Sequence, residues 1–438
     1  MNRKIRTIAA VMAVTMLLGA CGSPARHTRR HDDDPDDIAP TVTGKDREEK
    51  QTDGIDFSAV QDASYDEETV DAYMQFAISL YANCVSEGEE DQNVMISPAS
   101  VLMAMGMVSA GASGNNLDEI ISTLAPGADP YELHAFAGDY NRRLNSADDS
   151  IRSVNSIWIN ENRSEGIYQD FLDYVTGTYD AEIRNIAFDP SGVDMINSWV
   201  NDNTDGMIPN IISELNNRDL MVLVNAIAFE QAWMIPYTDA DITEDHVFHN
   251  SDGTDSYVTM LFDTSYMNYY STDIAKGFAR PYEGGDYIFL TMLPADESIS
   301  ANEFVSSLTA EDFTEFWNSA TYDRVITMMP EFEADYDIEL NNVLQQMGIN
   351  EAFDDRGAGF GNMTDMEVYI SRVIHKTHIE LDRGGTRAAA ATAVDMATAS
   401  AEPEDYAPPT VILDRPYAYA IVEASTGLPL FIGTVNTL

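Results

Sequence analysis

The feature that most constrains this chain is an alternating stretch near its C-terminus, from Thr386 to Ala397. It follows two glycines and includes a run of four alanines. Every second position is small at first and then apolar, namely Thr386, Ala388, Ala390, Thr392, Val394 and Met396. The intervening positions hold the charged members of the stretch, Arg387 and Asp395. This period of two is typical of a half-buried β-strand.

A helix and a flexible linker are the two alternatives for this stretch. The four alanines favour a helix, but the glycines before them and Thr392 and Val394 after them limit that tendency. A linker would carry more Gly and Ser and would lead to another domain. Only "PPTVILDRPYAYAIVEASTGLPLFIGTV" follows, and this segment has the pattern of two buried strands. A strand is therefore the better prediction.

The chain is large and strongly acidic. Its 438 residues, 44% of them hydrophobic, can bury one large core or two ordinary ones. The 74 Asp and Glu residues outnumber the 24 Lys and Arg residues and give a formal charge of -50. Because such a charge opposes binding to nucleic acid or to anionic glycans, we expect no nucleic-acid partner and no glycan cofactor.

The first twenty residues have the pattern of an export signal. "MNRKIR" is basic, "TIAAVMAVTMLL" is apolar but short for a membrane span, and "LGAC" ends at Cys21. This ending resembles the lipobox of bacterial lipoproteins, in which the cysteine is acylated and becomes the mature N-terminus. A secretory signal with an incidental cysteine is the alternative. In both cases the protein leaves the cytoplasm, and in the first it is a cell-surface lipoprotein anchored to the membrane through Cys21.

Residues 21–64 and 65–438 differ in composition. The first segment is polar, lacks an apolar period and includes "DDDPDD", so we expect a disordered acidic tether. In the second, helical and strand patterns alternate irregularly without an internal linker, which predicts one domain of the α+β class. "DEETVDAYMQFAISLYANC" predicts a helix, with Cys84 buried in it, whereas "LMVLVNAIAFEQAW", "YIFLTMLPA" and "VIHKTHIELD" predict strands.

Motifs for catalysis are weak in this sequence. It has no G-x-S-x-G motif, and "GAGFGN" lacks the strand and helix that a phosphate-binding loop needs. His246 and His249 of "HVFH" would lie on opposite faces of a strand, so we expect them not to share a metal ion. We therefore expect no metal site, no cofactor and no enzymatic activity.

Six segments, taken together and in order, resemble the serpin family of serine protease inhibitors. They are "NVMISPASVLMAMGMVSAGASGNNLDEI", "INSWVNDNTDGMIPNII", "LVNAIAFEQAW", "MPEFEADYDIELNNVLQQMGINEAF", "GGTRAAAATA" and "LDRPYAYAIVEASTGLPLFIGTV". The resemblance extends from about Tyr65 to Leu438. It implies the serpin fold, with a large central β-sheet, two further sheets, surrounding helices and an exposed reactive-centre loop at about residues 383–410.

The resemblance also implies a suicide mechanism. A protease that cleaves the loop becomes acylated, and the loop then inserts as a new central strand of the large sheet. The positions that match the family's hinge are Gly384, Gly385, Thr386, Ala388, Ala389, Ala390, Ala391 and Thr392. The positions that match its shutter and breach, which control opening of the sheet, are Ser97, Pro98, Ser100, Asn225, Trp233 and His375. The two glycines would allow an antiparallel reversal after "VIHKTHIELD".

Family geometry places the scissile bond roughly fifteen residues past Gly385, about 50 Å along an extended strand. This count gives Ala399 and Ser400 as the reactive bond, with Thr398 as the alternative first residue. Small side chains suit the small primary pocket of elastase-like or subtilisin-like enzymes rather than the acidic pocket of trypsin-like enzymes. We expect a monomer whose partners are serine proteases of these types.

Several positions depart from the family pattern. Arg383 and Arg387 stand where serpins usually carry Glu, and Tyr417 replaces the signature Phe, while Glu230 and Gln231 replace a common basic residue and Gly. None of them places proline or a large inward side chain in the hinge, so they affect the rate of insertion more than its occurrence. A non-inhibitory serpin that serves as a binding or structural module is the alternative. Such members often lose the small hinge residues, which "TRAAAATAV" keeps.

Overall fold

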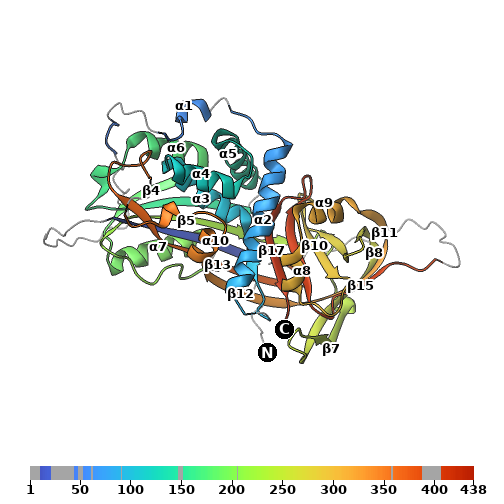
Figure 1. The fold of residues 1–438 in the computed structure, drawn as a ribbon. Helices are drawn as coiled ribbons and strands as arrows, with labels where there is room; N and C mark the ends of the chain where they lie inside the picture. The colour runs from blue at the N-terminus through green and yellow to red at the C-terminus, as the bar shows by residue number, and fades with distance from the viewer. Residues whose placement is uncertain are drawn as a thin grey trace.

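Two extended β-sheet assemblies with helices packed on them make up the computed structural model of this chain (Figure 1). The structure describes residues 10–20, 44–47, 53–60, 63–89, 91–146, 151–204, 206–356, 359–386 and 406–438. Helices and strands are mixed along the chain, as the sequence predicts for the α+β class.

The central sheet has eight strands in the order β4-β3-β5-β1-β13-β14-β6, with β12 paired to β13. Their bounds are β1 (Ala10–Ala20), β3 (Ile151–Asn160), β4 (Ala181–Ile186), β5 (Asp219–Phe229), β6 (Gln231–Ala232), β12 (Phe332–Glu339), β13 (Val368–Asp382) and β14 (Gly385–Thr386). The predicted strands "LMVLVNAIAFEQAW" and "VIHKTHIELD" are β5 with β6, and β13. Every residue of β5 is buried, as expected for a strand that is covered on both faces.

The second assembly has nine strands in the order β15-β11-β8-β9-β10-β16-β17-β2, with β7 paired to β8. Their bounds are β2 (Met95–Ile96), β7 (Ile242–His249), β8 (Asp255–Ser271), β9 (Ala275–Pro281), β10 (Tyr287–Pro294), β11 (Thr321–Pro330), β15 (Thr410–Ile412), β16 (Tyr417–Glu423) and β17 (Pro429–Val435). Because β8 pairs with β9 only between Tyr269 and Ser271, the assembly divides there into two smaller sheets. The prediction of one large and two further sheets is therefore confirmed.

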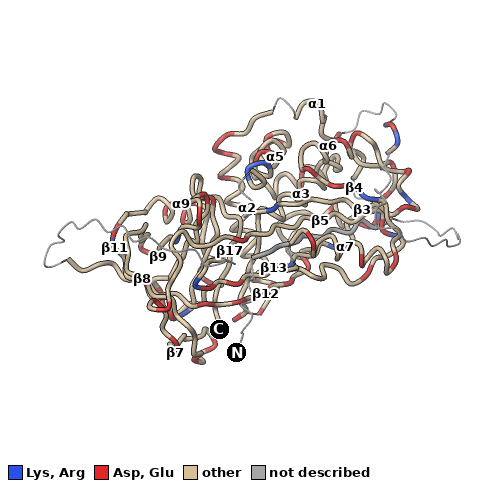
Figure 2. The backbone as a smooth tube through the Cα atoms, turned by 180° about the vertical axis from the view of Figure 1, so that it is seen from behind, with Lys and Arg blue, Asp and Glu red and all other residues tan. Residues whose placement is uncertain are grey.

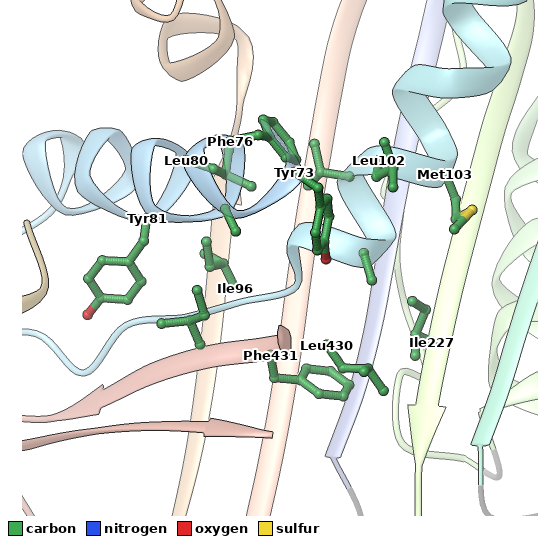
Figure 3. Packing of buried hydrophobic residues seen from close by; sticks show 14 of the residues in the cluster. Tyr73, Phe76, Leu80, Tyr81, Ile96, Leu102, Met103, Ile227, Leu430 and Phe431 are labelled. Atoms are coloured by element: carbon green, nitrogen blue, oxygen red, sulfur yellow. The ribbon is translucent and has the colours of Figure 1, made fainter. Parts of the chain in front are cut away.

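The described helices pack on these sheets. They are α1 (Phe57–Val60), α2 (Glu67–Glu87), α3 (Pro98–Gly111), α4 (Asn115–Leu124), α5 (Pro130–Ser146), α6 (Gln169–Tyr179), α7 (Pro190–Asn203), α8 (Ala301–Ser307), α9 (Ala310–Asn318) and α10 (Asn341–Gln346). Figure 3 shows Tyr73 of α2 and Leu102 of α3 in one buried cluster with Ile227 of β5. All residues of α3 are buried, so this helix lies between the large sheet and the other helices.

Strand β1 lies in the middle of the large sheet and consists of the apolar segment that the sequence identifies as part of an export signal. It runs antiparallel to β5 on one side and to β13 on the other. Its register places Val14 opposite both Asn225 and His375. The export signal concerns processing and stays a prediction, but a place for these residues inside the fold was not expected from the sequence.

Two pieces of the predicted tether, residues 44–47 and 53–60, lie against the domain. The Arg47 guanidinium is 3.0 Å from the Asp170 carboxylate and lies over the Tyr168 ring, 4.9 Å from its centroid. These two pieces therefore do not fit the prediction that the chain is disordered up to residue 64. The difference arises because a few side chains in a polar stretch find partners on α6, which composition alone does not reveal.

The acidic side chains are spread over the whole body rather than gathered in one place. Figure 2 shows Asp and Glu positions along most elements, whereas Lys and Arg positions are few and scattered. In the described part of the chain, no helix is long and apolar enough to cross a bilayer.

Candidate functional site

The chain reverses its direction directly after β13 and returns as β14. Thr386 of β14 pairs with Leu381 of β13 on one side and with Gln231 of β6 on the other. Gly385 has a φ of 147°, and a Cβ at this position would lie 2.3 Å from the Gln231 carbonyl oxygen. A side chain here would be strained and would also collide with backbone, so the position requires glycine.

Trp233 holds this reversal from the side of β6. Its backbone N–H donates to the carbonyl oxygen of Gly384, and its indole N–H donates to that of Asp382, both at 2.9 Å. Its ring stacks on Tyr282 with the centroids 4.7 Å apart, and the Tyr282 hydroxyl is 2.7 Å from the hydroxyl of Thr386. Trp233 therefore contacts the point at which a strand that continues from β14 would enter the sheet.

Arg383, one of the departures from the family pattern, lies at the outer side of the reversal. Its guanidinium is 3.3 Å from the Glu331 carboxylate and 3.1 Å from that of Asp239. Since the Arg383 side chain is 45% exposed, each ion pair stabilises the turn by less than about 1 kcal/mol. Acidic neighbours thus accommodate the arginine at this position.

A buried polar chain connects α3 to β5 and β3. Ser97 caps α3 by accepting a hydrogen bond from the backbone N–H of Ser100 at 3.0 Å, and Pro98 begins the helix. The Ser100 hydroxyl donates to the side-chain oxygen of Asn225, and the Asn225 amide donates to Asn155 at 3.0 Å. Loss of one partner would leave a buried polar group unsatisfied, at a cost of about 1–3 kcal/mol.

His375 lies on the opposite side of β1 from Asn225. Its Nε2 accepts a hydrogen bond from the backbone N–H of Ser97 at 3.3 Å, so the proton of the neutral ring is on Nδ1. Burial lowers the pKa of His375 to about 3, which keeps the ring neutral at pH 7. Within the described residues, Nδ1 has no hydrogen-bond partner. The Nδ1–H group of His375 is therefore a buried hydrogen-bond donor without an acceptor in the described part of the chain.

Among the strands that the structure describes, β1 lies between β5 and β13 and joins them at the middle of the large sheet (Figure 1). Ten residue pairs join β1 to β5, and ten join it to β13. We call the space between β5 and β13 that β1 fills the insertion slot. Its two walls carry Asn225 and His375, two of the predicted shutter residues. The predicted breach residue Trp233 lies near β14, beyond the end of the slot at which Ala10 pairs with Phe229.

Sequence reasoning missed Asn155 and the strand in the slot. Asn155 is a polar residue in the otherwise largely apolar segment "IRSVNSIWIN", and its amide also donates to the carbonyl oxygen of Tyr179 at 2.7 Å. A buried Asn requires such partners, so its place in a buried strand was a usable signal. No comparable signal marks residues 10–20 as a strand, because a short apolar run fits an export signal equally well.

Several predicted site residues lie outside the described part of the chain. They are the reactive-bond residues Ala399, Ser400 and Thr398, the hinge residues Ala388, Ala389, Ala390, Ala391 and Thr392, and the lipidation residue Cys21. Among the residues that are described, no cluster of three or more His, Cys, Asp and Glu side chains could hold a metal ion.

The central sheet of this protein holds the strand β1 at its middle, between β5 and β13. Close to the end of that strand the chain reverses its direction at Gly385, a position that requires glycine. A family model described as "Serpin (serine protease inhibitor)" matches residues 71–438, and the chain belongs to this family. The match includes β5, β13, β14 and the polar chain around Asn225, but it begins after β1.

Solved and curated relatives agree with this assignment. The crystal structure of the thermophilic serpin tengpin in the native state has a TM-score of 0.76 and 32% sequence identity, over 86% of this chain and 98% of that one. An uncharacterized serpin-like protein of Methanosarcina acetivorans is 28% identical, over 89% of this chain and 92% of its own length. A serine protease inhibitor of Cyanea capillata is 28% identical, over 82% and 96% respectively.

Replacement of Gly385 by alanine should destabilise the protein beyond the ordinary cost of a positive φ. Gly284→Ala is the matched control, because Gly284 has a φ of 86° but its Cβ would meet no atom closer than 3.9 Å. We expect Gly385→Ala to lower the free energy of unfolding by about 2 kcal/mol more than the control does. Urea or thermal unfolding of both variants measures the difference, and equal losses would contradict the required contact with Gln231.

Proposed function

We propose that the protein is a suicide inhibitor of serine proteases, which traps its target by cleavage of the loop after β14 and insertion of that loop into the slot between β5 and β13. The observation that carries this proposal is the backbone register: β14 lies in the large sheet directly in line with β1. Membership of a family of serine protease inhibitors supports the reaction class.

The register of β14 extends without interruption into the register of β1. Thr386 opposes Leu381, and a continuation of this ladder along β13 brings Ala389 opposite His378, which is the partner of Val11. The ladder on the other side, from β6 into β5, leads to the same correspondence. Continued along both walls, these ladders would bring residues 388–395 of the loop to the positions that residues 10–17 fill, and beyond Leu17 the register of β1 shifts by one residue.

This register also determines which loop side chains would be buried. Directly opposed residues of antiparallel strands share a face of the sheet, and Thr386 is buried together with its partner Leu381. On the same face, Ala390 would oppose the buried Thr377, and Thr392 would oppose His375. Thr392 would thereby bring a hydroxyl group to the ring whose Nδ1 has no hydrogen-bond partner among the described residues.

The charged residues of the loop would oppose charges of the other sign on the outer face. Arg387 would lie opposite Glu380, and Asp395 would lie opposite Arg372. Burial and the neighbouring Glu333 carboxylate raise the pKa of Glu380 to about 7, because negative charge is unfavourable at this position. An arginine at position 387 would relieve that repulsion, which gives the departure from the family's usual Glu a physical reason.

The length of the slot supports the predicted reactive bond. β1 ends at Ala20, opposite Val368, which is the first residue of β13. If the loop followed the one-residue shift of β1 between Leu17 and Leu18, the position of Ala20 would correspond to Thr398, whereas an unshifted ladder would bring Ala399 to it. In both cases Ala399 would lie at the end of the slot or directly beyond it. An acyl-enzyme at Ala399 would then emerge at the far end of the sheet. The small side chains at this bond favour elastase-like or subtilisin-like targets.

We also propose that the protein acts outside the cytoplasm, at the cell surface, as a lipoprotein anchored through Cys21. The basic start, short apolar segment and "LGAC" ending support export and acylation. The inhibitor needs no catalytic residue, metal or cofactor of its own, since the protease supplies the chemistry.

The direct test is incubation with purified serine proteases of elastase, subtilisin, trypsin and chymotrypsin type. We expect a complex that survives boiling in SDS with the first two, and mass spectrometry of the released C-terminal fragment should show a start at Ser400. A fragment that starts at Ala399 would move the bond by one residue, and a start before Asp395 would contradict the register. Cleavage without any stable complex would favour a non-inhibitory serpin.

Two neighbouring substitutions should separate the faces of the inserted strand. Ala390→Glu places a carboxylate against the buried Thr377, whereas Ala391→Glu places it on the outer face opposite Lys376. Because burial of an unpaired charge is costly, we expect Ala390→Glu to raise the number of inhibitor molecules consumed per trapped protease at least about tenfold. Ala391→Glu should stay close to the unsubstituted protein. Equal behaviour of the two variants would contradict the register.

A charge exchange should test the pairing of Arg387 with Glu380. Arg387→Glu adds a carboxylate opposite Glu380, and we expect insertion after cleavage to slow about threefold to tenfold. Glu380→Lys in the same chain should recover most of the rate, since it restores opposite charges. Rapid kinetics with a fluorescent label on the loop measures insertion. Additive effects in the double variant would show that the two positions do not meet.

A further inference from the structure

The strand in the insertion slot comes from a part of the chain that lies outside the serpin domain. β1 consists of residues 10–20, whereas the family model begins at residue 71. The other strands of the large sheet all belong to the matched range. A strand at the centre of the sheet is thus supplied by a segment that this chain carries in addition to its domain.

β1 pairs with the strands that form the two walls of the slot, β5 and β13. The residues of β1 pair with Asp219–Phe229 of β5 and with β13 from Val368 to His378. The backbone groups along two facing strand edges would otherwise have to find other partners. The segment "AVMAVTMLLGA" also has no charged residue and no proline, so its composition suits a central strand.

The leader strand and the reactive loop cannot occupy the slot together. By continuation of the β14 register, the reactive loop would take the positions against β5 and β13 that residues 10–20 fill, so one strand would have to leave before the other could enter. While the leader is covalently attached, it competes with the loop as an intramolecular ligand. After cleavage it becomes a separate, dilute peptide, whereas the loop stays attached and keeps its high effective concentration.

The end of β1 coincides with the predicted processing site. β1 ends at Ala20, and lipoprotein processing would cut the chain immediately before Cys21. The cut would therefore remove the whole strand and no residue that follows it. The removed segment is the export signal itself, so loss of the strand is tied to passage out of the cytoplasm.

We propose that residues 10–20 are an intramolecular ligand of the insertion slot, so that the precursor cannot insert its reactive loop, and that removal of the leader before Cys21 makes the protein inhibitory. The proposal rests on the insertion mechanism proposed above. It assigns a second role to the export signal: a strand that holds the slot filled until the chain is processed.

A disulfide trap in the full chain tests the occupancy of the slot without any protease. Met16 and Leu223 are direct partners between β1 and β5, and opposed residues of antiparallel strands have the Cα spacing that a disulfide needs. With Cys21→Ser as background, the pair Met16→Cys and Leu223→Cys should cross-link on mild oxidation. The pair Met12→Cys and Leu223→Cys is the matched control, offset by about 13 Å along the strand, and should not. Equal cross-linking of both pairs, or none, would overturn the proposal.

Trapping of protease tests the competition. Val14→Pro in the full chain removes a ladder hydrogen bond in the middle of β1, and a chain that begins at residue 21 lacks the strand altogether. We expect both to trap protease at least about tenfold faster than the full chain. Thr7→Pro, which precedes the strand, should behave like the full chain.

The outcomes separate this proposal from the proposed function. If the full chain traps protease as fast as Val14→Pro and the leader-free chain, the competition is overturned while the inhibitory function stands. If the disulfide forms but no variant traps any protease, the inhibitory function fails while the leader remains shown as a ligand of the slot.

Discussion

The large sheet depends on one constraint: the backbone groups along the facing edges of β5 and β13 must be hydrogen-bonded, either to each other or to a strand between them. In this structure β1 meets that need with ten residue pairs on each side. Hydrogen bonding along a strand is largely independent of side-chain identity, so any extended segment with small or apolar side chains on the covered face can serve. The same constraint accounts for what residues 10–20 and the stretch from Thr386 to Ala397 have in common, namely small or apolar residues at alternate positions and no proline.

The polar residues around the slot add selectivity to this constraint. The chain from Ser100 through Asn225 to Asn155 is fully bonded, and it fixes β5 against α3. On the other wall, Nδ1 of His375 has no hydrogen-bond acceptor among the described residues. Val14 of the leader is opposite His375 in register. Threonine in the reactive loop would offer a hydroxyl at the same place, whereas valine offers none. On the proposed mechanism, the slot would therefore bind the loop in preference to the leader.

Much of the fold could be predicted from residues alone, and the limits are physical. The alternation of β13, the helical spacing of α2 and the apolar run of β5 are all visible in the sequence, and Gly385 has a positive φ that favours glycine over other residues. Asn155 was missed because a polar residue in a strand shows its importance only once the strand is known to be buried. β1 was missed because a short apolar run serves a membrane and a sheet interior equally well. Its place depends on unpaired edges that lie two hundred residues and more away in the sequence.

The arginines of the hinge show how a departure from a family pattern can be balanced locally. Arg383 is already paired with Glu331 and Asp239, and both acidic residues lie outside the hinge. Burial and then the acidic neighbours Glu333 and Asp382 raise the pKa of Glu380, which lies opposite the expected place of Arg387. A glutamate at position 387 would add a further carboxylate there. In so acidic a protein, arginine at these positions suits the charge of the sheet that the hinge would join on the proposed mechanism.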